Sequence, residues 1–187
     1  IIALFCAVVV VKLRVSDSRS RARWMQLSVL DRPTGLLNKA SCEELCRRFL
    51  CMEPDTRSAM LIVDMDHFKE INDSEGHLFG DKVLYGIGAI LQNDLDEDTI
   101  TGRIGGDEFL ILVKHARDRA AENLAGRLLS RLRQAHVSEA GAAVTCSIGI
   151  AYAEAGGKDY AALFEQADKA LYQAKRGGGN RWAVYGR

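Results

Sequence analysis

The chain has 187 residues, and 25 Lys and Arg balance 25 Asp and Glu, so its formal charge is zero. Nucleic-acid-binding domains usually carry a basic excess, so no nucleic-acid partner is expected. The apolar fraction of 48% and the charged fraction of 27% exclude a mainly disordered protein. The five cysteines lack a paired spacing and are expected to be reduced thiols rather than a disulfide framework.

The N-terminal segment, residues 1–11, is apolar without a break and is followed by Lys12 and Arg14. It is shorter than the roughly 20 residues that cross a bilayer. We interpret it as the end of a transmembrane helix of a longer chain, with the two cations at the cytoplasmic border. The alternative is a buried strand or helix of a domain that this chain lacks.

Residues 12–30 are polar and contain neither Pro nor Gly, so a helix can continue through them to the break that Pro33 predicts. A heptad seam runs through this segment. Its positions are Val8, Val11, Val15, Ser18, Ala22, Met25 and Val29. Because Ser18 and Ala22 weaken the seam, we leave two interpretations open, a weak parallel coiled coil and a solvated linker helix.

Residues 31–187 are predicted to fold as an α/β domain in which helices flank a mixed, partly antiparallel sheet. Apolar residues at helical spacing predict helices over 41–50, 67–73, 78–95, 117–136 and 159–175. Ser41 and Glu44 have the spacing of a capping box at the first of these helices.

Short apolar or alternating runs predict the strands of the same domain. They cover residues 59–63, 99–104, 108–113, 144–152 and 182–185. The second and third are expected to form a hairpin through Gly105 and Gly106, because glycine tolerates the positive φ of tight turns.

Acidic residues gather at two strand ends. Asp64 and Asp66 follow the first strand, and Asp107 and Glu108 lie at the hairpin turn. If the hairpin pairs with the first strand, these carboxylates converge at one edge of the sheet. Such a cluster suits Mg²⁺ and a metal-assisted displacement at phosphorus. Taken alone, each acid also fits a solvated turn residue.

The motifs around these acids resemble the GGDEF family of bacterial diguanylate cyclases. The matching segments, in order, are residues 31–38, 64–81, 103–109, 146–151 and 167–175. The resemblance implies a palm-like fold similar to nucleotidyl cyclases and polymerases. It also implies the condensation of two GTP molecules into cyclic di-GMP with release of two pyrophosphates. In that reaction each 3′-hydroxyl attacks the α-phosphate of the other GTP across a homodimer. Together with the N-terminal segment, we expect a location at the bacterial inner membrane with the catalytic domain in the cytoplasm.

The resemblance also implies catalytic and metal-binding roles. Asp64 and Asp107 match the metal-binding acids, and the Met65 carbonyl matches a backbone ligand, for Mg²⁺ or Mn²⁺. Glu108 matches an acid essential for catalysis, as a metal ligand or in deprotonation of the 3′-hydroxyl. Lys69 matches a point charge for the β- and γ-phosphates, and we include it among the catalytic residues.

The substrate-binding roles follow in the same way. His67, Phe68 and Lys69 match the segment over the β- and γ-phosphates, and Lys175 matches a γ-phosphate contact. Gly105 and Gly106 match the turn that approaches the α-phosphate. Asn72 and Asp81 match the guanine readers, although singly they would pass for a helix cap and an N-terminal helix acid. Two residues are left with two alternative roles each. His77 packs beneath the nucleotide or is a structural histidine, and Arg103 supports the hairpin or contacts a phosphate.

Two departures from the family pattern stand out. The family often has Arg at the position of Gly179, so a phosphate contact is lost unless Arg176 or Arg181 replaces it. The product-inhibition tetrapeptide Arg-x-x-Asp is here residues 96–99, with Asp96 and Thr99 at its defining positions. These departures keep an alternative open, a GGDEF domain that binds GTP as a regulatory module without synthesis.

Overall fold

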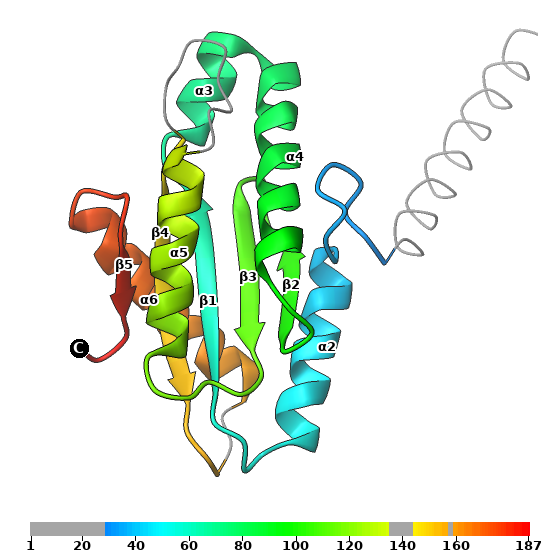
Figure 1. Ribbon diagram of the computed structural model, residues 1–187, viewed down its shortest axis with the longest axis vertical. Coiled ribbons are helices and arrows are strands. Elements are labelled where there is room, and N and C mark those ends of the chain that lie inside the picture. The colour runs from blue at the N-terminus through cyan, green and yellow to red at the C-terminus, as the bar shows by residue number, and fades with distance from the viewer. Residues whose placement is uncertain (1–28, 135–143, 157–158) are drawn as a thin grey trace, which may run out of the picture.

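The computed structural model describes residues 29–134, 144–156 and 159–187. A five-stranded sheet forms its middle layer, in the order β2-β3-β1-β4-β5 (Figure 1). The strands are β1 (Ser58–Met65), β2 (Thr99–Arg103), β3 (Glu108–Val113), β4 (Cys146–Ala153) and β5 (Trp182–Val184). β1 pairs antiparallel with β3 and β4, β2 pairs antiparallel with β3, and β4 pairs parallel with β5. The predicted mixed sheet is confirmed.

Five helices are described, and they cover both faces of the sheet. Their bounds are α2 (Lys39–Met52), α3 (Phe68–Glu75), α4 (His77–Asp94), α5 (Ala120–Gln134) and α6 (Tyr160–Arg176). α4 and α5 pack on one face, and α2 and α6 pack on the other (Figure 1). The domain is therefore a three-layer α/β/α sandwich.

The alternation of side chains along β1 builds both cores. Leu61 and Val63 belong to the core under α4 and α5, whereas Met60 and Ile62 belong to the core under α2 and α6. All eight residues of β1 are buried, because neighbouring strands cover its edges and helices cover its faces. A strand buried on both faces reads as a continuous apolar run, which is the pattern that the sequence shows before Asp64.

The start of α2 corrects the predicted capping box. The helix begins at Lys39, and the side chain of Asn38 accepts a hydrogen bond from the Ser41 N–H at 2.9 Å. Asn caps a helix as well as Ser does, and a capping side chain binds the N–H two or three positions further along the chain. Ser41 is thus the bound residue and not the cap.

Residues 1–28, 135–143 and 157–158 lie outside the described residues. The predicted membrane segment and most of the predicted linker helix fall in the first of these ranges, so they stay predictions. Within the part of the chain that the structure describes, no helix is long and apolar enough to span a bilayer.

Candidate active site

Three of the four carboxylates expected to converge, those of Asp64, Asp107 and Glu108, meet at the end of β1. Asp64 lies directly opposite Glu108 in the β1–β3 register, and opposite Ser147 in the β1–β4 register. The next turn brings Asp107 to the same place, because its carbonyl accepts a hydrogen bond from the Met65 N–H at 3.3 Å. The hairpin therefore pairs with the first strand, which was the condition for the carboxylates to converge.

Burial and like charge shape the electrostatics of this cluster. Asp64 is only 7% exposed, and burial raises the pKa of its carboxyl group. The Lys175 ammonium, 2.7 Å from Asp64 Oδ2, opposes that rise, whereas the charges of Asp107 and Asp66 add to it. Burial also raises the pKa of Glu108, and the charges of Asp64 and Asp107 raise it further. The cluster is thus short of positive charge.

A divalent cation fits this donor set. Asp64 and Asp107 supply carboxylate oxygens, and the Met65 backbone lies directly after Asp64 in the chain. Among the described residues, no three His, Cys, Asp or Glu side chains are grouped so that they could hold a metal by themselves. Mg²⁺ commonly takes one or two protein carboxylates and completes its shell with substrate phosphates and water. Asp64 and Asp107, with the Met65 carbonyl, could therefore supply part of the shell of such an ion.

Asp66 does not join the cluster in the way that the period of the strand predicted. β1 ends at Met65, and the Asp66 carboxylate accepts hydrogen bonds from the hydroxyls of Thr145 (2.9 Å) and Ser147 (2.7 Å). It also accepts one from the Asn180 N–H at 2.9 Å. Asp66 thus joins three segments far apart in sequence, and the single sequence carries no signal for that role.

A cavity of about 420 Å³ opens beside Asp64. Its lining residues are Asp64, Met65, Asp66, His67, Lys175, Gly178 and Gly179. His67 adopts the left-handed conformation (φ 59°) at the start of α3, and its Nδ1 lies 3.0 Å from Glu70 Oε1, which raises the pKa of the imidazole. The start of α3 and Lys175 favour an anion in this cavity, whereas the carboxylates of Asp64 and Asp66 in its wall disfavour one.

The residues predicted to cover the phosphates differ in what they offer. The Phe68 side chain is buried in the core under α4, so only its backbone can face a ligand. Lys69 is exposed at the start of α3 and can reach into solvent or toward a ligand. In this segment, the Phe68 side chain thus belongs to the core, and the Lys69 side chain supplies an exposed positive charge.

The two predicted guanine readers lie at the junction of α3 and α4. The Asn72 amide packs against Gly80, where an added Cβ would lie 2.0 Å from Asn72 Oδ1. Gly80 therefore leaves room for this amide, and Asp81 follows it on the exposed side of α4. His77, the first residue of α4, is exposed.

Neither hairpin glycine has a positive φ, and only Gly105 is short of space for a side chain. Neither Gly105 nor Gly106 is among the glycines with a positive φ, so that part of the prediction is wrong. A Cβ at Gly105 would lie 2.4 Å from Glu108 Oε2, whereas one at Gly106 would meet nothing within 4 Å. Gly105 thus clears the position of the Glu108 carboxylate, and Gly106 leaves an open approach.

Arg103 supports the hairpin. Its guanidinium donates to the Gly106 carbonyl through Nη2 (2.6 Å) and Nε (3.2 Å), and its Nη1 lies 3.3 Å from Asp31 Oδ2. Asp31 in turn accepts a hydrogen bond from the Thr34 hydroxyl at 2.7 Å. Of the two roles left open for Arg103, the structure places it in the first.

The segment around Gly179 holds the position of the missing family arginine. Gly179 has φ +67°, and an added Cβ would lie 3.2 Å from the Asp66 carboxylate. Arg181 Nε donates to the Gly179 carbonyl at 3.2 Å, so a cation does lie beside the cavity wall. Arg176 instead lies over the Tyr172 ring, 5.8 Å from its centroid.

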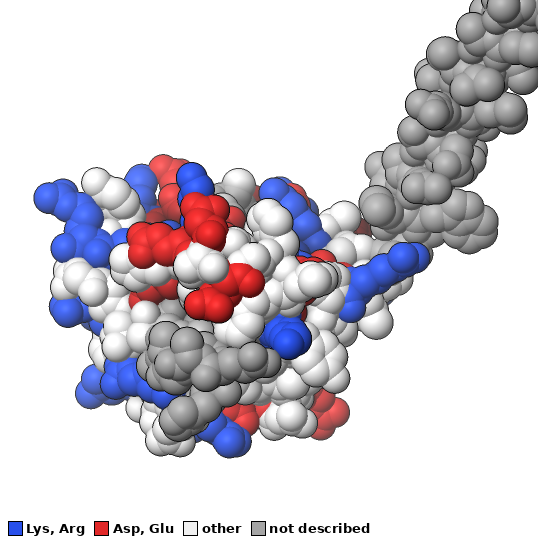
Figure 2. Space-filling view, turned by 90° about the horizontal axis from the view of Figure 1, so that it is seen from above, with Lys and Arg blue, Asp and Glu red and all other residues white. Residues whose placement is uncertain are grey.

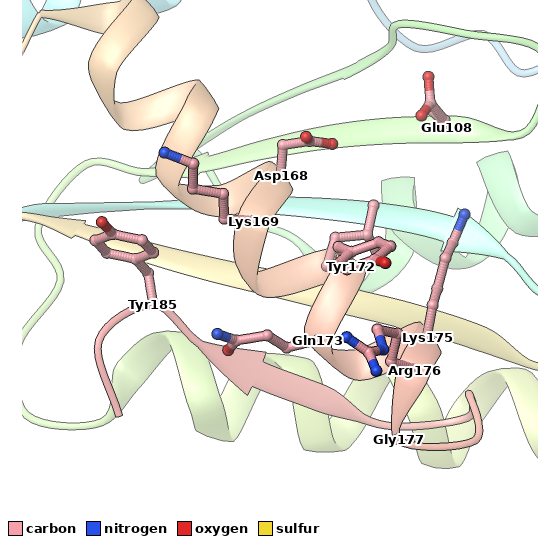
Figure 3. Close-up of a pocket in the computed structure, with 10 residues that line it drawn as sticks. Glu108, Asp168, Lys169, Tyr172, Gln173, Lys175, Arg176, Gly177 and Tyr185 are labelled. Atoms are coloured by element: carbon pink, nitrogen blue, oxygen red, sulfur yellow. The ribbon is translucent and has the colours of Figure 1, made fainter.

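A second, larger cavity of about 830 Å³ adjoins the site along α6, and it includes Glu108 and Lys175 (Figure 3). Asp168, Tyr172 and Arg176 line it from successive turns of the helix. Among the α6 residues of this cavity, only Lys175 has a role predicted from the sequence. The four-residue spacing of Asp168, Tyr172 and Arg176 is the signal that could have shown this surface.

Figure 2 views the end of the molecule at which α3 lies in Figure 1. Acidic side chains gather toward the middle of this end, and Lys and Arg lie mostly around its edge. The local charge is therefore uneven although the formal charge of the chain is zero.

Comparison with known proteins agrees with this geometry. The family model described as "Diguanylate cyclase, GGDEF domain" matches residues 28–181. Diguanylate cyclase DgcP of Pseudomonas aeruginosa is 39% identical over 168 residues, which cover 85% of this chain and 24% of DgcP. Cyclic di-GMP phosphodiesterase PdeR of Escherichia coli is 34% identical over 170 residues, which cover 90% of this chain and 26% of PdeR. The chain thus spans about a quarter of the length of these two relatives.

Solved structures show the same fold. The active GGEEF domain of a diguanylate cyclase from Vibrio cholerae is 28% identical with a TM-score of 0.77, over 81% of this chain and 99% of that one. The GGDEF domain of DgcB from Caulobacter crescentus, in complex with c-di-GMP, has a TM-score of 0.81 at 24% identity, over 86% and 97%. With the paired acids at the end of β1 and a family match over residues 28–181, the chain belongs to the diguanylate cyclase GGDEF domain family.

Proposed function

We propose that this domain is a diguanylate cyclase that condenses two GTP molecules into cyclic di-GMP and two pyrophosphates. The observation that carries the proposal is the register of Asp64 opposite Glu108, with Asp107 in the connecting turn and Lys175 on Asp64. A vestigial site has no need to keep mutually repelling carboxylates at a buried strand end. The name of DgcP, the relative at 39% identity, supports the same activity.

The side chains around this cluster have separate tasks in the proposed reaction. Glu108, whose pKa burial and neighbouring acids raise, serves as the proton acceptor near the 3′-hydroxyl. Lys175 and Lys69 neutralise phosphate charge, and the amides at the start of α3 bind phosphate oxygens. Asn72 and Asp81 bind the guanine edge. A carboxylate at Asp81 accepts hydrogen bonds from guanine N1–H and N2–H, which adenine cannot provide.

A Mg²⁺ or Mn²⁺ ion completes the proposed site. Asp64, Asp107 and the Met65 carbonyl would hold it, because they are hard oxygen donors at the end of one strand. Such an ion, when bound, stabilises the negative charge that develops on the α-phosphate.

The reaction requires two domains, because each GTP supplies one nucleophile and one electrophile. We therefore propose a homodimer as the active form, with residues 1–11 as a membrane anchor and residues 12–30 as the tether. Tethering raises the effective concentration to about millimolar for short linkers. A shortened chain that begins at Asp31 should accordingly lose specific activity on dilution and regain it as its concentration rises.

The proposal is tested by incubating the purified chain with GTP and Mg²⁺ and measuring cyclic di-GMP and pyrophosphate. We expect one cyclic di-GMP for two pyrophosphates, and no product with a chelator. Tight GTP binding without product, at every protein concentration, would instead indicate the regulatory GTP-binding module. The loss of the family arginine at Gly179 is the observation that favours this second function.

A further inference from the structure

We infer that the stripe Asp168, Tyr172 and Arg176 on α6 is the surface through which two copies of this chain meet in the act of catalysis. The inference rests on the proposed function, because the proposed reaction requires a second copy to face this site.

The stripe adjoins the candidate active site directly. Glu108 and Lys175 line the same 830 Å³ cavity as Asp168, Tyr172 and Arg176 (Figure 3). Asp168 lies near enough for its charge to act on Glu108. A partner that delivers a second GTP to Glu108 must therefore pass over or rest on this part of α6.

The exposure of the stripe indicates a contact surface. Tyr172 is 62% exposed, and Arg176 lies over its ring. Tyr and Arg are enriched at protein interfaces, where an aromatic ring supplies contact area at a low entropic cost. Asp168 is exposed, and the described residues offer it no ion-pair partner among the salt bridges of the structure.

The order of charges along α6 complements itself. Asp168 lies four residues before Tyr172 and Arg176 lies four residues after it. A twofold axis at Tyr172 would run two copies of α6 antiparallel, so that Asp168 faces the partner's Arg176 and Arg176 faces the partner's Asp168. An isologous interface needs such a self-complementary patch, because each surface contacts its own copy. The second copy is thus the occupant that the charges fit.

Charge reversal separates this arrangement from a local effect. In Asp168→Arg, both contacts across the axis pair two cations, and in Arg176→Glu both pair two anions. A 1:1 mixture of the two variants contains a dimer in which both contacts are again opposite in sign. The double variant Asp168→Arg/Arg176→Glu restores the pairing within its own homodimer. An effect on the GTP of the same domain would not be repaired by mixing.

The experiment measures the initial rate of cyclic di-GMP formation against protein concentration for the full chain. We expect each single variant to need about tenfold more protein or higher for half-maximal specific activity, because like charges across an interface disfavour association. The mixture and the double variant should return toward the wild-type curve. The matched control reverses two exposed charges on α2 in the single variants Glu44→Arg and Arg48→Glu. Each should keep the wild-type dependence of specific activity on protein concentration, and mixing the two should not change it.

The outcomes distinguish failure of the proposed function from failure of the proposed α6 contact surface. If the wild type makes no cyclic di-GMP at any concentration, the proposed function fails. Two results with an active wild type would show that the α6 surface is not the meeting point. In the first, the single variants behave as the control does. In the second, the single variants are impaired, and neither mixing them nor combining the two substitutions restores activity. GTP-analogue binding by each variant, expected to be unchanged, shows that the nucleotide pocket is intact.

Discussion

The Lys175 ammonium lies 2.7 Å from Oδ2 of Asp64, so the most buried carboxylate of the site is paired with a cation from α6. Asp64 is at the end of β1 and Lys175 is in the last turn of α6, so this ion pair joins the centre of the sheet to the helix that leads into the glycine segment. A lysine in this position can serve the carboxylate or the phosphate of a bound nucleotide.

Replacing Lys175 by Ala should therefore weaken GTP binding more than it slows turnover. Loss of a hydrogen bond to a charged group costs about 1.5–3 kcal/mol, or about ten- to a hundredfold. We expect a rise in KM of that size with a smaller fall in kcat, and partial recovery in Lys175→Arg. Steady-state kinetics at saturating Mg²⁺ provide the check. Lys39→Ala, an exposed lysine on α2, is the control, and an unchanged KM in Lys175→Ala would remove the phosphate role.

The variant Asp107→Asn should fold normally and lose most activity. A neutral amide is a poor ligand for Mg²⁺, and removal of a group that stabilises transition-state charge commonly costs about a hundredfold or more in rate. The rate of cyclic di-GMP formation is measured beside a thermal melt, which should stay near that of the wild type. Near-normal turnover would contradict the metal assignment.

Glu108→Gln should be inactive and yet more stable than the wild type near neutral pH. The pKa of Glu108 is raised in the folded state from its ordinary 4.5, so the native chain binds a proton more tightly than the unfolded chain does. The free energy of unfolding must then fall as pH rises from that value through the folded pKa. Gln carries no charge, so the variant escapes this loss.

The measurement is urea unfolding of both proteins across pH, with a chelator present. The stability advantage of Glu108→Gln should be present near neutral pH and vanish in acid, where the wild-type carboxyl is protonated. Glu44→Gln on the exposed side of α2 should show no such trend. A variant less stable than the wild type at neutral pH would show that Glu108 makes favourable contacts that outweigh the repulsion.

Base selectivity should depend on Asn72 and Asp81. A site built on hydrogen bonds to one base can reject another by roughly 10⁴, because its polar groups would be left unpaired. Competition titrations should show ATP failing to displace GTP at similar concentrations. Asp81→Asn should narrow the difference, while Asp73→Asn, an exposed acid on α3, should not. Equal binding of ATP and GTP by the wild type would refute the assignment of these residues.

Cyclic di-GMP should not inhibit through the turn at residues 96–99. Asp96 closes this turn on itself, because its carbonyl accepts from the Thr99 hydroxyl at 2.8 Å and its Oδ1 accepts from the Asp98 N–H at 3.1 Å. Its carboxylate also repels a dianionic product. Initial rates over a range of GTP with added product should show only competition that excess GTP reverses.

Rebuilding the family tetrapeptide provides the matched test of that turn. The double substitution Asp96→Arg/Thr99→Asp should create a fall in maximal rate that GTP does not reverse. The guanidinium then offers a charge-assisted contact, and the carboxylate an acceptor for guanine N–H groups. If the wild type already shows non-competitive inhibition that is lost in Asp96→Ala, the turn binds product in a form that its sequence conceals.

The sequence was sufficient for the parts of the site that depend on strand periodicity and turn order. The apolar run before Asp64 predicted the strand, and the paired glycines before Asp107 predicted the hairpin. The pairing of the two was a condition that only the structure could establish. The sequence was insufficient to predict side-chain hydrogen bonds between residues that are far apart in the chain. Asp66 turns to Thr145, Ser147 and the backbone of Asn180, which are far from it in the chain, so local spacing could not reveal that choice.

Errors at helix and turn ends have a local cause. Asn38 and Ser41 are both residue types that cap helices well. Which of them caps α2 depends on the residue at which the preceding turn ends and the helix begins. The sequence allowed two explanations for Gly105, a positive φ and a lack of space, and the position of the Glu108 carboxylate decides for the second. Gly106 fits neither explanation, because its φ is not positive and a Cβ there would meet nothing within 4 Å. The α6 stripe is exposed, and exposed residues at four-residue spacing are common on helices. Only the position of Glu108 in the same cavity indicates a function for this stripe.

The burial of β1 along its whole length bears on how such an enzyme can be switched. Amide hydrogens of a strand covered on both faces and both edges exchange only when the whole domain opens, so Leu61 to Val63 should be among the slowest to exchange. The carboxylate at the end of that strand is then held by the most durable element of the fold. A signal too weak to unfold the domain leaves this geometry unaltered. In the proposed reaction, switching would therefore act on how often two complete domains meet and in what orientation.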